Sequence, residues 1–444
     1  MRELCVTPAE SSPNVLLVVM DSVRAQNCSL YGYRNQTTPF LDALADEATV
    51  YTQARAPSNW SLPSHVSLLT GIETHAHRVT VHDRLQPGAT VFETLAERGY
   101  DTGLFSENGF LTAHETGIKN AFETVVGVPD AYDDQYDTTA LNPAPDGYYF
   151  ADAFDQWRQN RDGRWAACVN LMDAHRPFEP RDRFDQWGEA FGRQLQEQLP
   201  TRWEWAFYGE SRPYWELQAL EQLYDGGIRQ TDAVLKRIVS RLRTTGALDD
   251  TLLVICGDHG DGFGQPGRLP AEPPSVSHIV PMSESLLHVP LVVRPPGSGS
   301  GDRCHHPAAL TAFPEVVLDR IDGTARPKGF ASNQVVATKQ PVTDDLRQRF
   351  VDHCAEPDRF LQPSQAVYVA SPGDGRAVRK QYFWGDDGVE CRIDSAGNVT
   401  ELSAIDPSRV RTAIDSTEVD IREPLSGEQV TNEAKEQLAA LGYY

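Results

Sequence analysis

The chain has 444 residues, of which 40% are hydrophobic and 23% are charged, as in ordinary globular proteins. Its formal net charge of −23 argues against a protein that wraps nucleic acid, because the phosphates would be repelled. No apolar run reaches the roughly 18 residues of a membrane span, and residues 1–12 lack the basic and apolar parts of a secretory signal, so we expect a cytoplasmic protein without a transmembrane segment.

Arginine dominates the basic residues, since only six of the 40 are Lys. An acidic, arginine-rich composition favours a protein adapted to high salt, where screening removes the cost of self-repulsion. The alternative is an acidic enzyme without salt adaptation. The seven Cys include no CxxC pair, which argues against a disulfide framework or a zinc ribbon.

Residues 14–20, NVLLVVM, form a continuous apolar run that predicts a central strand buried on both faces. Alternation of such runs with amphipathic segments predicts an α/β fold with a mostly parallel central sheet flanked by helices. Later elements are helices at 38–48, 64–69, 90–98 and 217–243, and strands at 102–105, 165–172, 251–256 and 286–294. We interpret residues 128–148 as a surface loop, and residues 181–215 as a cap or a peripheral insertion.

The composition changes after about residue 300, where polar residues 324–345 predict a connecting loop. The remainder of the chain predicts a smaller C-terminal antiparallel α+β subdomain, with strands at 366–370, 377–384 and within 389–402, a hairpin turn at 394–398 and a closing helix at 428–441. The predicted domains are therefore residues 1–320, which carry the catalytic groups, and residues 321–444.

Polar side chains follow three of the predicted buried strands. Asp21 follows the first, Asp173 and His175 follow another, and Asp258 and His259 follow a third. Ligands of α/β sheets bind beyond the carboxyl ends of the strands. The sequence therefore predicts a site at this edge of the sheet.

Several motifs occur in a fixed order along residues 13–300. They are VVMDSVRAQNCSLYGY from residue 18, APSNWSLPSHVSLLTG from residue 56, VNLMDAHRPFEP from residue 169 and TLLVICGDHGDGFGQ from residue 251. Together they resemble the sulfatase family, a branch of the alkaline phosphatase superfamily. The resemblance implies an alkaline-phosphatase-like sheet with a metal ion and a nucleophile at its rim.

Matched to the family, Asp21, Asp258 and His259 are expected metal ligands, and Ser61 is expected to be both nucleophile and ligand. A hard divalent cation prefers carboxylate oxygens and lowers the pKa of a coordinated hydroxyl, which Ser needs for reactivity. We expect one divalent ion, which could be Ca, Mg, Mn or Zn. The alternatives for single residues are a turn or cap role for Asp21 and a plain helix N-cap role for Ser61.

Other candidates carry less specific signals. His175 matches the family histidine that contacts the leaving group, although a surface-loop histidine is the alternative. His77 stands where many relatives have His before Gly, but Arg78 replaces that Gly, so its role is doubtful. Further expected site residues are His65 in catalysis and Arg24, Asn108 and His278 in substrate binding.

The chain departs from the family pattern at the nucleophile. Sulfatases carry C/S-x-P-S-R, whose first residue is oxidised to formylglycine, whereas here Ser61 is followed by Leu-Pro-Ser and then His65. The paired Asp-Asp of the family is also reduced to Met20-Asp21. Formylglycine at Ser61 would favour sulfate esters, and an unmodified Ser61 would favour phosphate esters.

Three functions remain open from the sequence. The first is a metal-dependent hydrolase of a sulfate (or phosphate) ester, acting on a small anionic ester or on a sulfated or phosphorylated glycan or lipid. The second is a phosphotransferase that moves a phospho-alcohol group to a sugar or lipid acceptor. The third is a non-catalytic binding protein on the same fold. The sequence carries no signal for an oligomeric state.

Overall fold

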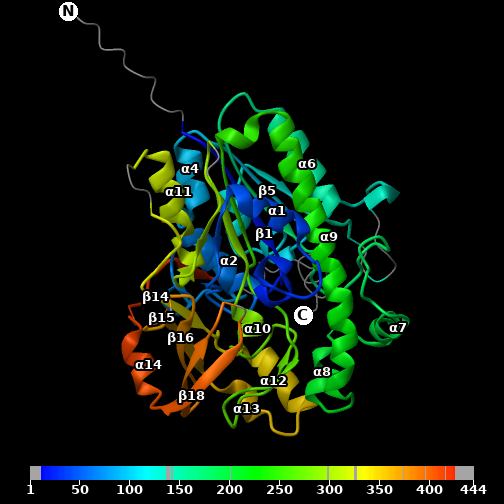
Figure 1. Cartoon of the computed structure of the whole chain (residues 1–444), viewed down its shortest axis with the longest axis vertical. Coiled ribbons are helices and arrows are strands. Elements are labelled where there is room, and N and C mark those ends of the chain that lie inside the picture. Colours follow the sequence, from blue (N-terminus) through cyan, green and yellow to red (C-terminus); the bar gives the residue numbers. More distant parts are fainter. Residues whose placement is uncertain are drawn as a thin grey trace, which may run out of the picture.

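The computed structural model describes residues 12–425 except 137–140, 142–143, 201, 298–299, 325–327, 374, 396 and 416 (Figure 1). Its centre is an eight-stranded sheet in the order β12-β2-β11-β8-β1-β7-β5-β6. The strands are β1 Asn14–Met20, β2 Thr49–Tyr51, β5 Asp101–Ser106, β6 Thr124–Val126, β7 Trp165–Leu171, β8 Thr251–Cys256, β11 Leu291–Arg294 and β12 Asp302–Cys304.

The five strands from β8 to β6 run parallel, whereas β11 is antiparallel to both of its neighbours. Strand β1 is the middle of the buried part, with Leu17 opposite Cys168 on one side and Val254 on the other. Every residue of β7 and β8 is buried. Strands covered on both faces in this way require helices on both sides of the sheet. The predicted mostly parallel α/β sheet is confirmed.

Two groups of helices supply this cover. On one side α9 contacts both α1 and α6, and on the other α2 contacts both α4 and α11 (Figure 1). The helices of this part are α1 Pro39–Leu44, α2 Ser61–Thr70, α3 Thr74–His77, α4 Val91–Glu97, α5 Gly109–Thr112, α6 Gly147–Gln159, α7 Ala190–Gln198, α8 Glu204–Tyr208, α9 Leu217–Thr244, α10 Glu284–Leu287 and α11 Phe313–Ile321.

Glycine allows α9 to approach the loop after β7 closely. A Cβ atom at Gly227 would lie 2.5 Å from the carbonyl oxygen of Asp173, a distance that real Cβ atoms do not reach. Gly227 therefore sets the position of the segment that carries Asp173 and His175, by letting the helix backbone contact it directly.

A second, antiparallel sheet lies in the C-terminal part, with the order β14-β15-β16-β17-β18, as expected there. It lies below the central sheet in Figure 1. The boundary at residue 320 stays a prediction. The elements are β14 Gln334–Thr338, β15 Ser364–Ala370, β16 Val378–Trp384, β17 Asp387–Ile393 and β18 Val399–Ile405, with α12 Asp344–His353, α13 Asp358–Leu361 and α14 Ser408–Ala413.

Three short pairings complete the fold. They are β3 Ala54–Arg55 with β13 Ala308–Ala309, β4 Asp83–Leu85 with β19 Arg422–Pro424, and β9 Phe263–Gln265 with β10 Ser275–Val276. The β4–β19 pair joins the end of the described chain to its first quarter. Within the described residues, no helix has both the length and the apolar character needed to cross a membrane.

Three predicted elements differ from the structure. The predicted loop 324–345 was wrong in part, because it contains β14 and the start of α12. The helix expected at 38–48 ends as α1 at Leu44 and continues as a 3-10 turn. The strand expected at 286–294 begins only at Leu291, because its first residues belong to α10 and Pro290 lacks the backbone donor that a ladder needs.

Two further segments complete the comparison with the predicted elements. Residues 181–215, expected as a cap or a peripheral insertion, contain α7 and α8. The closing helix predicted at 428–441 lies outside the described residues.

Candidate active site

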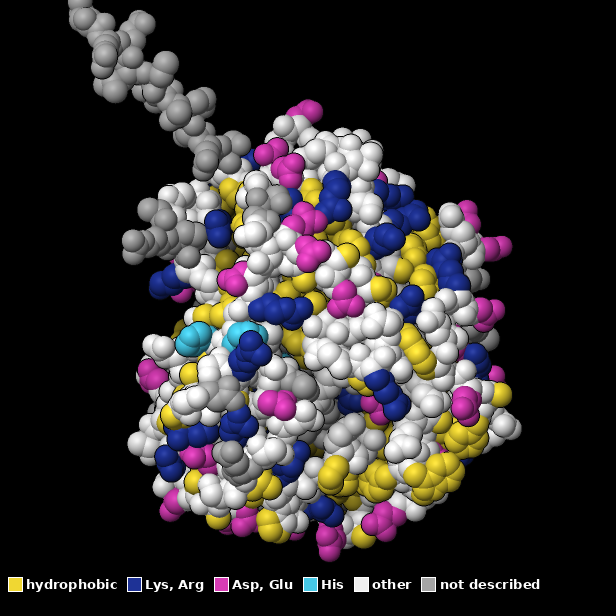
Figure 2. All heavy atoms as spheres, in the orientation of Figure 1, with side chains coloured by type: hydrophobic (Ala, Val, Ile, Leu, Met, Phe, Trp, Pro, Cys, Tyr) yellow, Lys and Arg dark blue, Asp and Glu magenta, His cyan; other side chains and the backbone are white. Residues whose placement is uncertain are grey.

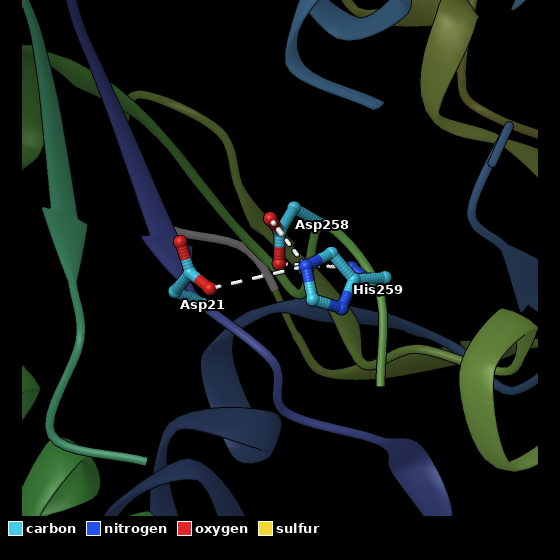
Figure 3. Close-up of side chains that lie close together, drawn as sticks. All are labelled: Asp21, Asp258 and His259. Carbon is cyan, nitrogen blue, oxygen red and sulfur yellow. Dashed lines mark hydrogen bonds and ion pairs between the residues drawn. The ribbon is translucent and has the colours of Figure 1, made fainter. Parts of the chain in front are cut away.

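The loops after β1 and β8 bring three polar side chains together at the carboxyl edge of the sheet. Asp21 directly follows β1, and Asp258 and His259 follow β8 by two and three residues. Figure 3 shows the two carboxylates and the imidazole facing one another. Their ligand atoms lie within 4.8 Å of one another and all three residues are fully buried. We call Asp21, Asp258 and His259 the carboxylate–histidine cluster.

Ser61 lies beside this cluster. Its Oγ is 3.0 Å from His259 Nε2, and that nitrogen is 3.3 Å from Asp258 Oδ2. Ser61 is the first residue of α2, and Trp60 occupies the N-cap position without a side-chain cap. The plain N-cap interpretation of Ser61 therefore does not apply, and the hydroxyl faces the cluster at the amino end of the helix.

The cluster has the donors that a divalent cation needs. Burial would raise the pKa of Asp21, but His175, His259, His65 and a hydrogen bond from Asn108 lower it to about 2. Burial and the charge of Asp21 raise the pKa of Asp258, whose buried Oδ2 accepts no hydrogen bond from the described residues. Two close carboxylates are stabilised by a cation, so the residues fit a divalent metal ion.

The tautomer of His259 also suits a metal ligand. Its Nδ1 lies 2.8 Å from the carbonyl oxygen of Gly260, so the ring donates its proton there. The lone pair is then on Nε2, which points toward the carboxylates. A backbone acceptor behind a ligating His fixes ring orientation in the same way in other metal sites.

Two amides hold Asp21 from behind. Asn108 Nδ2 and Asn170 Nδ2 donate to Asp21 Oδ2 at 3.0 and 3.2 Å, and Asn170 also donates to Ser106 Oγ. Asn108 was expected to bind substrate, and the structure places its amide on Asp21. Sequence reasoning missed Asn170, although an Asn inside the buried run of β7 is a readable signal.

Three more predicted histidines lie around the cluster. His65 Nδ1 bonds the Ser61 carbonyl oxygen at 2.9 Å and lies 3.6 Å from Asp258 Oδ2. The ring of His278 is 4.7 Å from that of His259 and 5.2 Å from that of His175. His175 Nδ1 donates to the carbonyl oxygen of Arg176 at 2.7 Å. Burial lowers the pKa of both His175 and His278.

Comparison with known proteins bears directly on the family of the chain. The family model described as Sulfatase matches residues 13–319, more than half of the chain. The chain belongs to the sulfatase family.

Two curated relatives show how far the similarity extends. Arylsulfatase K of Danio rerio is 21% identical over 78% of this chain and 70% of its own length. Arylsulfatase A of Bos taurus is 31% identical, but the match spans 28% of this chain and 27% of that protein. The chain thus matches only about a quarter of arylsulfatase A.

Solved structures share the fold at low sequence identity. A phosphonate monoester hydrolase of Agrobacterium radiobacter has a TM-score of 0.58 at 18% identity, over 89% of this chain and 90% of that one. The 2-O GAG sulfatase BT1596 has a TM-score of 0.59 at 16% identity, over 91% and 90%. The soluble domain of lipooligosaccharide phosphoethanolamine transferase A from Neisseria meningitidis has 0.53 at 17%, over 71% and 89%.

Two of the residues considered for the site of this sulfatase-family chain, Arg24 and His77, form hydrogen bonds or ion pairs with other parts of the protein. The Arg24 guanidinium donates to Asn27 and to the Asp261 carbonyl oxygen, and it pairs with Glu221. These contacts tie the loop after β8 to α9. His77 bonds Ser67 and the backbone of residue 79. Both side chains therefore support the chain around the cluster.

A cleft of about 650 Å³ opens next to the cluster in this family member. Asn59, Trp60 and His278 line its inner part, and α12 of the C-terminal region lines the other side. Sequence reasoning missed α12, because its packing against the larger part is a long-range contact without a local signal. Further residues that line the cleft are Phe110, Arg176, Arg202, Ile279, Val342 and Arg349.

Proposed function

We propose that the protein is a metal-dependent hydrolase of sulfate or phosphate esters, in which Ser61 or its formylglycine form attacks the sulfur or phosphorus atom. The observation that carries this proposal is the 3.0 Å contact between Ser61 Oγ and His259 Nε2, beside two buried carboxylates. An isolated serine hydroxyl is a poor nucleophile and needs activation. The groups beside Ser61 could supply that activation.

Asp21, Asp258 and His259 would hold the cation, which supplies a lowered hydroxyl pKa and neutralises developing negative charge. The backbone N–H groups of Ser61 and Leu62 at the start of α2 would favour an anionic ester at Ser61, whereas Pro63 has no N–H and that of Ser64 donates to the Trp60 carbonyl oxygen. Because Nδ1 of His175 donates to the Arg176 carbonyl oxygen, His175 would have to carry a second proton on Nε2 to donate to the leaving-group oxygen, and the alcohol would leave with that proton. On an unmodified Ser61, water would then cleave the ester and return a proton to the neutral imidazole.

The nature of residue 61 decides between the two ester classes. A formylglycine hydrate expels sulfate by returning to the aldehyde, whereas an unmodified serine ester must be cleaved by water. His65 stands where the family has Arg, and it bonds the Ser61 carbonyl. This departure favours an unmodified serine and phosphate esters. The fold does not decide between the two classes, because a phosphonate monoester hydrolase and a 2-O GAG sulfatase share it equally.

The deciding experiment is the mass of the Ser61 peptide from protein purified from its native host. A peptide two hydrogens lighter than the serine form means formylglycine, and 4-nitrophenyl sulfate is then the expected substrate. An unmodified peptide directs the assay to 4-nitrophenyl phosphate. With either substrate, Asp21→Ala should lower kcat/KM by on the order of 100-fold or more, and the exposed Asp182→Ala should not. Full activity of the Asp21 variant would refute the proposal.

The second candidate is transfer of a phospho-alcohol group to a sugar or lipid acceptor by the same centre. It is favoured by the fold shared with phosphoethanolamine transferase structures, one of which is described as a complex with Zn. Product analysis with an added acceptor alcohol separates transfer from hydrolysis. Failure to bind any divalent metal would instead favour a binding protein on this fold.

A further inference from the structure

One wall of the cleft beside the cluster carries three arginines, Arg176, Arg202 and Arg349, together with the acidic Asp345 and Asp352. Arg176 and Arg202 both pair with the carboxylate of Glu204, which is fully buried. The Arg176 charge also acts on the buried carboxylate of Asp261, so Glu204 and Asp261 together balance these two guanidinium groups. A partly buried guanidinium group without such a partner is stabilised when an anion binds to it.

Arg349 adds a third cation from α12. Burial, together with the charges of Arg176 and Arg349, lowers the pKa of Arg202 despite the nearby Glu204, so the Arg349 charge acts on the same wall. Within the part of the chain that the structure describes, the Arg349 side chain has no ion pair within 4.0 Å and no hydrogen bond. Asp345 and Asp352 line the cleft on the same helix, and neither is within ion-pair distance of Arg349.

The inner part of the cleft has an apolar lining. Trp60 and Phe110 meet edge to face with ring centres 5.5 Å apart, and Ile279 and Val342 extend this surface. His278 lies at the inner end, where its ring is 4.7 Å from His259. An ester bound at Ser61 would therefore have its alcohol part in the cleft, between apolar side chains and the arginines.

We propose that the alcohol part of the substrate carries a second anionic group, a carboxylate, sulfate or phosphate, that binds Arg349 and Arg202 while its apolar face packs on Trp60. This inference rests on the proposed function, because it names the substrate class of the same site. Arg349 determines specificity here and takes no part in the chemical step. Its open guanidinium fits a planar, bidentate anion.

The test measures binding of non-hydrolysable probes to the full-length, Mn²⁺-loaded protein by titration calorimetry. The probes are phenylphosphonate and its 3-carboxy, 4-carboxy and 4-carboxymethyl derivatives. The proteins are the wild type, Arg349→Gln, Arg349→Lys and the control Arg347→Gln. Arg347 lies on the same helix, is exposed and does not line the cleft. Melting temperatures check that each variant is folded.

At least one carboxylated probe should bind the wild type roughly tenfold more tightly than phenylphosphonate, as expected for a charge-assisted contact at a partly exposed site. Arg349→Gln should lose most of this advantage, Arg349→Lys should keep part of it, and Arg347→Gln should keep all of it. The inference is overturned if no carboxylated probe binds more tightly, or if Arg349→Gln keeps the advantage. Turnover of 4-nitrophenyl esters tests the proposed function separately, so the two failures are distinguishable.

Discussion

At the scale of single residues, the orientation of Asp21 depends on two amides from different elements. Asn170 belongs to β7, and Asn108 is the N-cap of α5 just after β5. A carboxylate with fixed orientation binds a cation without losing rotational freedom. Against the effect of burial, the charges of His175, His259 and His65, followed by the hydrogen bond from Asn108, lower the pKa of Asp21.

We therefore predict that Asn170→Ala weakens binding of a divalent cation by about 10–100-fold, the usual effect of removing a residue that orients a ligand. Titration calorimetry with Mn²⁺ measures the change. Asn160→Ala, at the exposed end of α6, is the matched control and should bind Mn²⁺ like the wild type. Equal affinities of the Asn170 variant and the wild type would show that Asp21 does not need this amide.

The sequence predicted the candidate residues of the cluster and Ser61 better than the residues that support them. Ordered motifs with unusual polar residues after apolar runs placed Ser61 and the carboxylate–histidine cluster, and the structure brings these residues together. Ser22 was not found, although its backbone N–H donates to Asp258 Oδ1 at 3.0 Å. This backbone contact depends on the positive φ of 61° that Ser22 adopts. A serine in the sequence does not indicate such a backbone conformation.

At the scale of elements, one buried carboxylate connects α10 and the short strand β3 to the C-terminal sheet. Glu284 of α10 lies 2.9 Å from Arg55 Nε of β3 and 3.0 Å from Lys380 Nζ of β16, and Tyr368 of β15 donates to it. Burial would raise the pKa of Glu284, but the two cations lower it from the ordinary value of 4.5 to about 2. Folding therefore favours the ionised form.

The lowered pKa of Glu284 gives the stability of the fold a pH dependence of defined sign. The ionised carboxylate stabilises the fold above pH 4.5, and this contribution of roughly 3 kcal/mol is lost as the pH falls toward 2. We predict that Glu284→Gln lowers the free energy of unfolding at pH 7, and that the difference from the wild type shrinks between pH 5 and pH 2.

Urea unfolding at several pH values measures this difference, and Glu356→Gln, whose side chain is 80% exposed, is the control. A difference that stays constant between pH 5 and pH 3 would contradict the assignment of this pH dependence to Glu284.

Elements were predictable where their signal is local. The buried strands β1, β7 and β8 are continuous apolar runs that need no knowledge of a partner. Strand β14 was missed because its short apolar run, Val335 to Ala337, lies in polar sequence and is buried by elements distant in the chain, among them β15, α3 and α14. Tertiary contacts, and not the local β propensity, determine that this segment forms a strand.

At the scale of the whole molecule, the charge of −23 is the dominant property of the surface. Figure 2 shows acidic side chains spread over the visible face, with no single acidic patch. A distributed charge of one sign opposes the compact state, and salt screens that repulsion. We propose on this basis that the protein is adapted to high salt.

The prediction is that the melting temperature rises by several degrees between 0.1 and 2 M KCl. Most of the rise should occur below 1 M, where the screening length falls from about 10 Å to about 3 Å. Differential scanning calorimetry measures it. A melting temperature that is unchanged or falls over this range would identify an acidic protein without salt adaptation.

The pairing of β4 with β19 has a consequence for synthesis on the ribosome. Strand β4 is made early, whereas its partner strand is among the last described residues to emerge. The ribosome adds about 5–20 residues per second, so β4 has an unpaired backbone edge for on the order of a minute or less. A nascent chain stalled before Arg422 would therefore present this edge to chaperones or to a second nascent chain, and only synthesis of β19 closes it.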